Sequence, residues 1–127
     1  MPGKSNPSPL GPVLLIEDNF LVARVICDML EELGSQWLLA SSIETGVEAL
    51  TAHPVGLVLS DIELPGELDG IALVRRLRHS HPDIPALLMT GNPTKAADAE
   101  AEFTVLMKPF GLRQLSDAIG TLLSSRK

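Results

Sequence analysis

Charged and hydroxyl side chains stand at the ends of the apolar runs in this sequence. Glu17 and Asp18 follow the first run, Asp61 follows the third, Thr90 closes the fourth and Lys108 follows the last. Carboxylates are the hard oxygen ligands that Mg²⁺ prefers. An ammonium group suits a phosphoryl oxygen as a point charge. If the five side chains meet, they form a site for a divalent metal and a phosphoryl group, with the Asp61 carboxylate as the nucleophile toward phosphorus.

The apolar runs alternate with helical patterns from residue 13 onward, which is typical of an α/β sheet. Each run is continuously apolar, as expected for parallel strands covered on both faces. The carboxyl ends of neighbouring parallel strands share one edge of a sheet, and ligands bind at that edge. The pattern therefore predicts that the five side chains meet there. We expect strands at 13–16, 37–40, 55–60, 86–89 and 103–107, and helices around 22–33, 43–50, 71–77, 93–101 and 112–122.

Length and composition restrict the class of protein. The chain has 127 residues, 45% of them apolar and 20% charged, which fits one globular domain. The net charge of −6 argues against direct binding of nucleic acid. No apolar run approaches the roughly 20 residues that cross a bilayer, and no secretory signal is present, so we expect no membrane insertion. The single Cys27 excludes an internal disulfide and favours a cytoplasmic location.

The two ends of the chain differ from its centre. Among the first twelve residues, eight are Pro, Gly or Ser, so we expect residues 1–12 to form a flexible tail. The alternating pattern covers residues 13–123, which we expect to form one domain, and it leaves 124–127 as a C-terminal tail.

Several of these residues also have ordinary structural explanations. The pair Glu17-Asp18 suits the start of a helix, where acids complement the helix dipole. Lys108 suits a solvated strand end, although Pro109 after it indicates a turn that aims the lysine inward. The three histidines, His53, His79 and His81, are expected to be surface residues away from the acids. The cluster Arg75, Arg76 and Arg78 is expected to be a solvated face of the helix at 71–77.

Four motifs resemble those of receiver domains, the phosphoacceptor modules of two-component response regulators. They are LLIEDN, VLSDIELP with Asp69-Gly70, LLMTG and LMKPF, and they occur in this order at the expected strand ends. The resemblance runs from about residue 13 to residue 123. It implies a flavodoxin-like, doubly wound α/β fold with a five-stranded parallel sheet in the order 2-1-3-4-5.

The resemblance also implies roles for the acids. Asp61 would accept a phosphoryl group from a histidine kinase. Mg²⁺ would be held by Asp18, Asp61 and the backbone carbonyl of Glu63, and Glu17 would act mostly through a bound water.

On the other side of the site, the resemblance implies that Lys108 pairs with the phosphoryl group. Thr90 would supply the hydroxyl that shifts toward that group. The peptide bond between Lys108 and Pro109 would be cis, a form that is rare without a structural reason.

Three features depart from the usual receiver pattern. Val105 stands where receivers have Tyr or Phe, three residues before the lysine. The interval from Thr90 to Lys108 is short, so we expect the helix at 93–101 to be short or irregular. The loop between Asp61 and Asp69 carries about one extra residue. These features resemble stand-alone and hybrid-kinase receivers, and they concern the output surface rather than the phosphorylation chemistry.

The function implied is a phosphorylation-activated switch. It would take its phosphoryl group from a sensor histidine kinase or a phosphotransfer protein, and signal to a downstream protein by contact or onward transfer. Beyond slow hydrolysis of its own phosphoryl group it would not be an enzyme. The alternative is a pseudo-receiver, an interaction module that phosphorylation does not regulate, and the complete set of five residues argues against it. A small-molecule phosphatase would need a general acid and a substrate pocket, and the sequence indicates neither.

Overall fold

The elements of the chain alternate between strand and helix from the first to the last. The computed structural model describes residues 11–124. Their order is β1 (Val13–Ile16), α1 (Phe20–Glu32), β2 (Trp37–Ala40), α2 (Ile43–Ala52), β3 (Leu57–Asp61), α3 (Gly70–Ser80), β4 (Ala86–Thr90), α4 (Pro93–Glu100), β5 (Thr104–Met107) and α5 (Leu112–Ser124).

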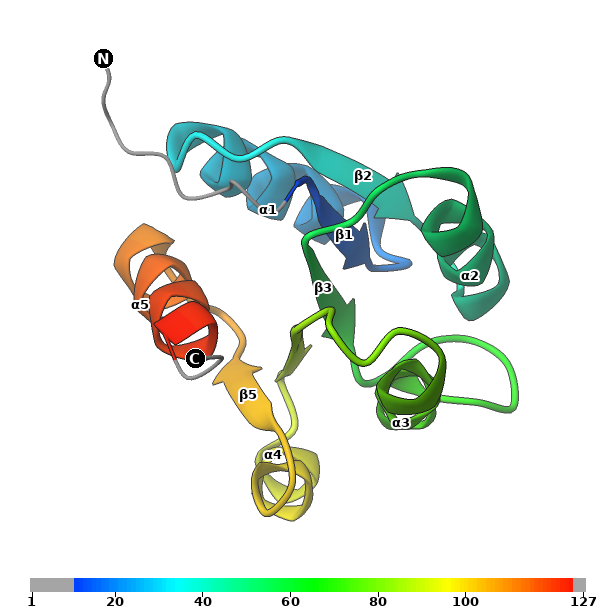
Figure 1. The fold of residues 1–127 in the computed structure, drawn as a ribbon. Helices are drawn as coiled ribbons and strands as arrows, with labels where there is room; N and C mark the ends of the chain where they lie inside the picture. Colours follow the sequence, from blue (N-terminus) through cyan, green and yellow to red (C-terminus); the bar gives the residue numbers. More distant parts are fainter. Residues whose placement is uncertain (1–10, 125–127) are drawn as a thin grey trace.

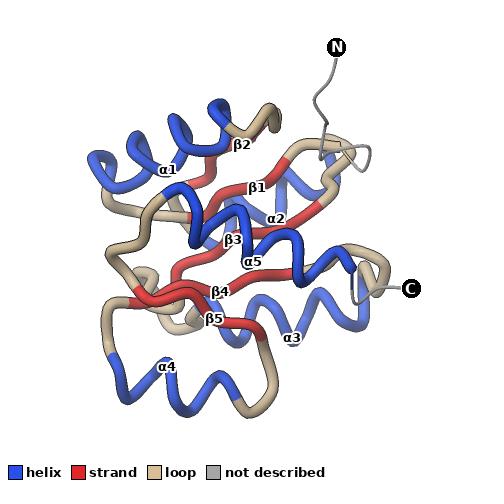
Figure 2. Tube along the Cα trace, turned by 90° about the vertical axis from the view of Figure 1, so that its left-hand side faces the viewer, coloured by secondary structure: helices blue, strands red, loops and turns tan. Residues whose placement is uncertain are grey.

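The described strands form one parallel sheet in the order β2-β1-β3-β4-β5 (Figure 1). Helices α1 and α5 cover one face, and α2 and α3 cover the other. In the orthogonal view of Figure 2, α5 crosses in front of the sheet and α4 lies beside β5 at its edge. The predicted α/β class and strand order are confirmed.

Alternation along the strands divides the core between the two faces. Leu15 of β1 packs in one hydrophobic cluster with residues of α1 and α5. Its neighbours Leu14 and Ile16 pack in a second hydrophobic cluster with residues of α2 and α3. All three are 0% exposed. Successive strand side chains point to opposite faces, so a strand covered on both must be apolar throughout. This is why the strands read as unbroken apolar runs.

The boundaries of three strands differ from prediction by one or two residues. The third strand was expected at 55–60, but β3 begins where Leu57 pairs with Val13, and it includes Asp61. β4 extends to Thr90, whose carbonyl accepts a hydrogen bond from the amide of Lys108. β5 begins after Phe103, whose amide bonds back to α4. Asp61 is therefore the last residue of β3, and Thr90 is the last residue of β4.

Helix α4 is short, as predicted, with eight residues, but it is regular. The side chain of Asn92 caps its first turn, accepting hydrogen bonds from the amides of Thr94 and Lys95. Pro93 occupies the first turn, where a backbone N–H would have no acceptor within the helix, so its missing N–H costs no hydrogen bond. Ala96 and Ala99 are buried on its inner face. Small side chains let this helix lie close to β5.

The predicted tails fall largely outside the described residues. Of residues 1–12, only 11 and 12 are described, and the carbonyl of Pro12 accepts a hydrogen bond from the amide of Gly56. Of residues 124–127, only Ser124 is described, as the last residue of α5.

The arginines of α3 do more than face solvent. Arg75 and Arg78 bond the carboxylate of Glu102 at 2.8 and 3.1 Å, and Arg78 also bonds the Glu102 carbonyl. The Arg78 guanidinium stacks on the ring of Phe103, 4.4 Å from its centroid. The prediction of a merely solvated arginine face is therefore incomplete, because two of the three arginines tie α3 to the segment between α4 and β5.

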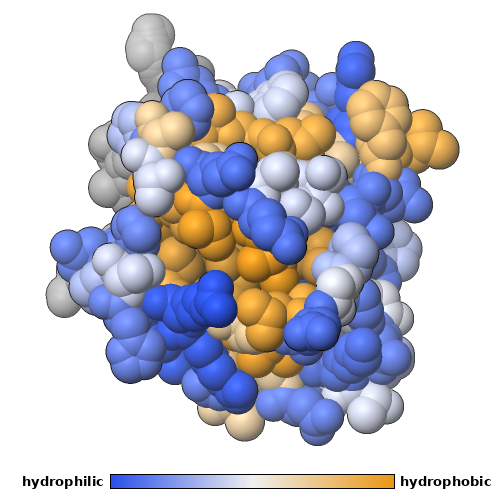
Figure 3. Space-filling view, turned by 90° about the vertical axis from the view of Figure 1, so that its right-hand side faces the viewer, coloured by the Kyte–Doolittle hydropathy of each residue, from blue (hydrophilic) through white to orange (hydrophobic). Residues whose placement is uncertain are grey.

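Surface hydropathy varies over the molecule. Figure 3 shows an apolar area on the face that α2 and α3 form, surrounded by hydrophilic side chains. A groove of about 620 Å³ lies between α2 and the loop before α3, and its lining includes Ile43, Val47, Leu68 and Arg76. Within residues 11–124, no helix is long and apolar enough to span a bilayer.

Candidate functional site

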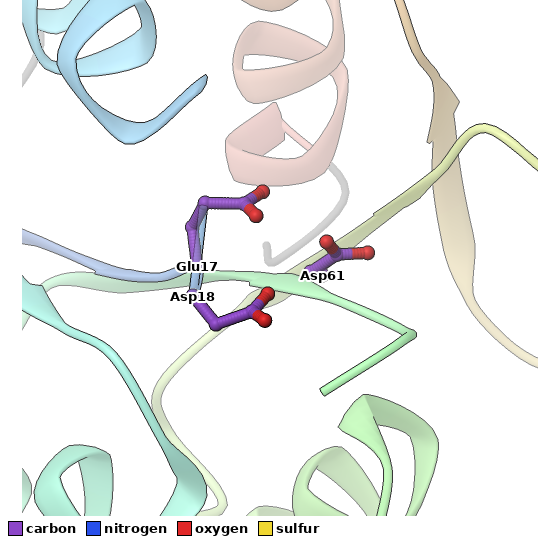
Figure 4. Close-up of side chains that lie close together, drawn as sticks. All are labelled: Glu17, Asp18 and Asp61. Carbon is purple, nitrogen blue, oxygen red and sulfur yellow. The ribbon is translucent and has the colours of Figure 1, made fainter. Parts of the chain in front are cut away.

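Three carboxylates converge at the carboxyl edge of the sheet. Glu17 and Asp18 follow β1, Asp61 ends the neighbouring strand β3, and Figure 4 shows their side chains extending toward one another. One oxygen from each lies within 4.8 Å of the others. Glu17 and Asp61 are only 3% and 4% exposed, whereas Asp18 is exposed. The cluster therefore consists of two buried acids, Glu17 and Asp61, and one solvent-exposed acid, Asp18.

Lys108 supplies the cation of the site. Its Nζ lies 2.9 Å from Oδ2 of Asp61 and 3.0 Å from Oε1 of Glu17. The peptide bond to Pro109 is cis, as predicted. A lysine that bonds two buried carboxylates is not a solvated strand-end residue, so the ordinary explanation of Lys108 is wrong.

The hydroxyl of Thr90 lies at the same edge and is fully buried. It donates toward the carboxylate of Glu63, with both oxygens at 2.9 Å, and accepts from the amide of Asn92 at 3.0 Å. The second Glu63 oxygen lies 3.8 Å from Nζ of Lys95. Thr90 is thus placed by the end of β4, and its one proton is engaged by an acid from the loop after β3.

The start of α1 is capped by a residue other than the two acids. Oδ1 of Asn19 accepts from the amide of Val22 at 3.0 Å, which is the usual work of an N-cap. Glu17 contributes only by accepting from the Asn19 amide at 3.1 Å. The capping explanation therefore does not account for Glu17-Asp18, and the exposed carboxylate of Asp18 is left facing the site.

The loop that carries Glu63 is held tightly between β3 and α3. Oδ1 of Asp69 accepts from the amide of Ala72 and caps α3, and the amide of Gly70 bonds the carbonyl of Ile62. A side chain at Gly70 would overlap the carbonyl oxygen of Asp61. Only glycine fits this close approach. The Asp69-Gly70 pair of the sequence motif therefore fixes the loop, and with it the backbone of Glu63.

The charges at the site are unbalanced. Burial raises the pKa of Asp61 to about 7; Lys108 opposes that rise, and Glu17 and Glu63 add to it. Burial lowers the pKa of Lys108, but its hydrogen bonds to Asp61 and Glu17 outweigh this and leave that pKa above its ordinary value. One ammonium therefore serves two buried acids and neutralises neither of them fully.

The donor set fits a divalent cation of the Mg²⁺ class. The oxygens offered are carboxylates, and two or three of them with water and phosphate oxygens meet the preference of Mg²⁺. The amide of Glu63 lies 3.2 Å from Oδ1 of Asp61, so the backbone of Glu63 borders the same acid. The structure thus brings together Glu17, Asp18 and Asp61, and the Glu63 backbone adjoins Asp61. Metal binding by these four residues stays a prediction.

Sequence reasoning missed two contributors to this site. Lys95 reaches Glu63 from the first turn of α4, and nothing in its local sequence marks it. The hydroxyl of Ser60 bonds the carbonyl of Asp61 at 2.9 Å, which helps to fix the strand end. A serine before the acid could have been noticed. The histidines lie elsewhere: His53 and His79 are exposed, and His81 is partly buried.

The fold and the site together define a class of protein. Residues 13–120 match the family model of the response regulator receiver domain. The chain therefore belongs to the receiver domain family, as its motifs predicted.

The relatives include both small and large proteins. The chain is 35% identical over 115 residues to the response regulator receiver protein CpdR of Brucella abortus, spanning 87% of this chain and 95% of CpdR. It is 34% identical over 123 residues to the sensor kinase CckA of the same organism, spanning 90% of this chain but only 13% of CckA. Among solved structures, a response regulator receiver domain protein of Clostridium thermocellum superposes with a TM-score of 0.80 at 27% identity, covering 92% of this chain and 97% of that one.

Proposed function

We propose that this chain is a phosphorylation-activated receiver that accepts a phosphoryl group on Asp61 from a histidine kinase or a phosphotransfer protein. The observation that carries the proposal is a buried nucleophile that lies beside a cation and beside the carboxylates that would hold a metal. Lys108 lies 2.9 Å from Asp61, and two more carboxylates lie within 4.8 Å. The alternative of an unregulated pseudo-receiver has no observation in its favour, since all five residues of the site are in place.

The geometry suits transfer from a phosphohistidine. An Asp61 oxygen attacks phosphorus as the bond from phosphorus to the donor imidazole breaks, and the electron pair of that bond leaves with the imidazole nitrogen. Lys108 already bonds Asp61 and stays beside the arriving phosphoryl oxygens as a point charge. Mg²⁺, held by Asp18, Asp61 and the Glu63 carbonyl, would neutralise further charge. Such transfer needs mainly alignment and charge compensation, which a small site provides.

The test uses a small phosphodonor such as acetyl phosphate. With Mg²⁺, the wild-type chain is expected to gain one phosphoryl group by intact mass, and with EDTA none. Asp61→Ala should gain none, because it lacks the acceptor oxygen. Asp117→Ala, which removes an exposed acid of α5, should label like wild type. Equal labelling of Asp61→Ala and wild type would rule out Asp61 as the acceptor.

An exposed apolar surface lies directly beside the site. Helix α1 exposes Phe20, Leu21 and Val25 to 70%, 74% and 54%. Leu21 and Val25 line a groove of about 530 Å³ between α1 and the segment after β5, and Lys108 and Phe110 line its other side. Contiguous exposed apolar patches are typical of protein–protein interaction sites. Because Lys108 borders both the groove and Asp61, we propose that a helix of the phosphodonor protein docks here.

Val25→Glu should therefore slow phosphotransfer from a protein donor. A charge placed in an apolar contact is expected to reduce the rate about tenfold or more, as loss of a central contact does. The donor is any histidine phosphotransfer domain that labels wild type, and radiolabel transfer is followed over time. The rate with acetyl phosphate should stay unchanged, and so should both rates in Val47→Glu, an exposed valine of α2. Equal transfer to Val25→Glu and Val47→Glu would exclude this surface.

A further inference from the structure

The hydroxyl of Thr90 is already in use before any phosphoryl group arrives. It has one proton, and both oxygens of Glu63 lie 2.9 Å from it. A bond from a hydroxyl to a carboxylate is stronger than one between neutral groups. Its other side accepts from the Asn92 amide, so the hydroxyl is held in this direction. In this arrangement Thr90 has no proton to offer to another acceptor.

The role that the resemblance to receiver domains implies for Thr90 uses that same proton. A phosphoryl oxygen on Asp61 would be a strong acceptor, and Thr90 can donate to it only by leaving Glu63. Glu63 therefore competes with the incoming group for Thr90. Once released, the Glu63 carboxylate would stand beside a group carrying close to two negative charges. Its amide is 3.2 Å from Asp61, so it cannot move far by backbone displacement without disturbing the acceptor.

Lys95 is the group that can take over the Glu63 carboxylate. Its Nζ lies 3.8 Å from Oε2 of Glu63, too far for a hydrogen bond and near enough for an ion pair. The amide of Lys95 is fixed by the Asn92 cap at 3.1 Å. The side chain is 48% exposed and Glu63 is 38% exposed, so both side chains have room to move. A small shift would bring the ammonium onto the carboxylate.

We propose that Glu63 and Lys95 form a latch on Thr90: Glu63 holds the hydroxyl before transfer, and Lys95 draws Glu63 away when the phosphoryl group arrives. The inference rests on the proposed function. In this account Glu63 slows phosphorylation and Lys95 counteracts Glu63. The two residues act through Thr90 and are positioning residues.

The latch makes opposite predictions for its two members. Glu63→Ala should raise the rate of phosphorylation by acetyl phosphate with Mg²⁺ about tenfold, because one charge-assisted hydrogen bond no longer has to break. The backbone carbonyl at position 63 remains. Lys95→Met should lower the rate severalfold, because Glu63 then has no cation to move to. Glu67→Ala, in the same loop and exposed, should react like wild type.

The double variant decides between a latch and independent effects. Lys95→Met in the Glu63→Ala background should leave the rate of Glu63→Ala unchanged, because Lys95 acts only through Glu63. If Lys95→Met slows both backgrounds equally, the lysine merely attracts the anionic donor and the latch is wrong. An unchanged or lower rate in Glu63→Ala also overturns it. If wild type takes up no phosphoryl group at all, the proposed function fails first, which distinguishes the two.

Discussion

Lys108→Met is expected to lower the free energy of unfolding of the metal-free protein by about 3–5 kcal/mol near pH 8, since it removes one partner of a buried ion pair. Glu17 and Asp61 would then face each other, 3% and 4% exposed, with no ammonium between them. For a chain of this size the loss corresponds to a drop in melting temperature of about 10–20 °C. Thermal unfolding in EDTA, followed by circular dichroism, measures it.

The free energy of unfolding that Lys108→Met loses should be smaller at acidic pH. The folded pKa of Asp61 is raised to about 7 from an ordinary value of 3.8, so between these values the folded state binds more protons than the unfolded state. Stability contributed by this residue therefore falls as pH rises through that window. Without Lys108 the folded pKa rises further, because the opposing charge is gone. Near pH 5.5 a proton on Asp61 replaces the missing cation, and we expect less than half of the loss seen near pH 8.

Lys95→Met is the comparison for that measurement. Lys95 is half exposed, and its ion pair with Glu63 is 3.8 Å long. Exposed pairs contribute about 0–1 kcal/mol, so its melting temperature should remain within a few degrees of wild type. Equal melting of Lys108→Met and Lys95→Met near pH 8 would show that Lys108 does not compensate the buried acids.

Mg²⁺ is expected to stabilise the wild-type chain strongly, and Asp18→Asn should remove most of that effect. Three carboxylates within 4.8 Å repel by about 1 kcal/mol or more per pair, depending on the dielectric around them. A cation that binds only the folded arrangement adds about 2.7 kcal/mol at a hundredfold excess over its dissociation constant. Removing the charge of Asp18 should therefore raise the melting temperature in EDTA and reduce the gain from millimolar Mg²⁺.

Asp117→Asn provides the control, because it makes the same chemical change at an exposed position of α5. Its melting temperature in EDTA should equal that of wild type, and Mg²⁺ should raise this temperature by as much as in wild type. If Asp18→Asn melts below wild type in EDTA, the acids do not repel as described. If it gains as much from Mg²⁺ as wild type does, Asp18 does not hold the metal.

The sequence could predict those site residues whose positions follow from the topology of the sheet. Asp61 and Thr90 end neighbouring strands, and Lys108 follows the next, so an unbroken apolar run and parallel pairing suffice to bring them to one edge. The order of the strands in the sheet, by contrast, was implied by the resemblance of the four motifs to receiver domains, and the structure confirms it.

The contacts that sequence could not predict depend on loop paths and side-chain directions. Glu63 reaches Thr90 across 27 residues, and Arg78 reaches Glu102 across 24. No periodicity links such positions, because each lies in a loop or at a helix end whose course the pattern does not define. Exposed charges such as Lys95 look like any solvated residue until a partner is seen beside them. The latch proposed for Thr90 was therefore visible only in three dimensions.

The central claim is that the carboxylate of Asp61 carries the phosphoryl group as an acyl phosphate. Chemical trapping tests this claim most directly. Borohydride reduces an aspartyl phosphate to an alcohol, and peptide mapping by mass spectrometry then locates the reduced position. After treatment with acetyl phosphate and Mg²⁺, we predict reduction at position 61 alone, and none when EDTA replaces Mg²⁺. Reduction at Glu17 or Asp18, or a phosphorylated protein with no reduced residue at 61, would contradict the account.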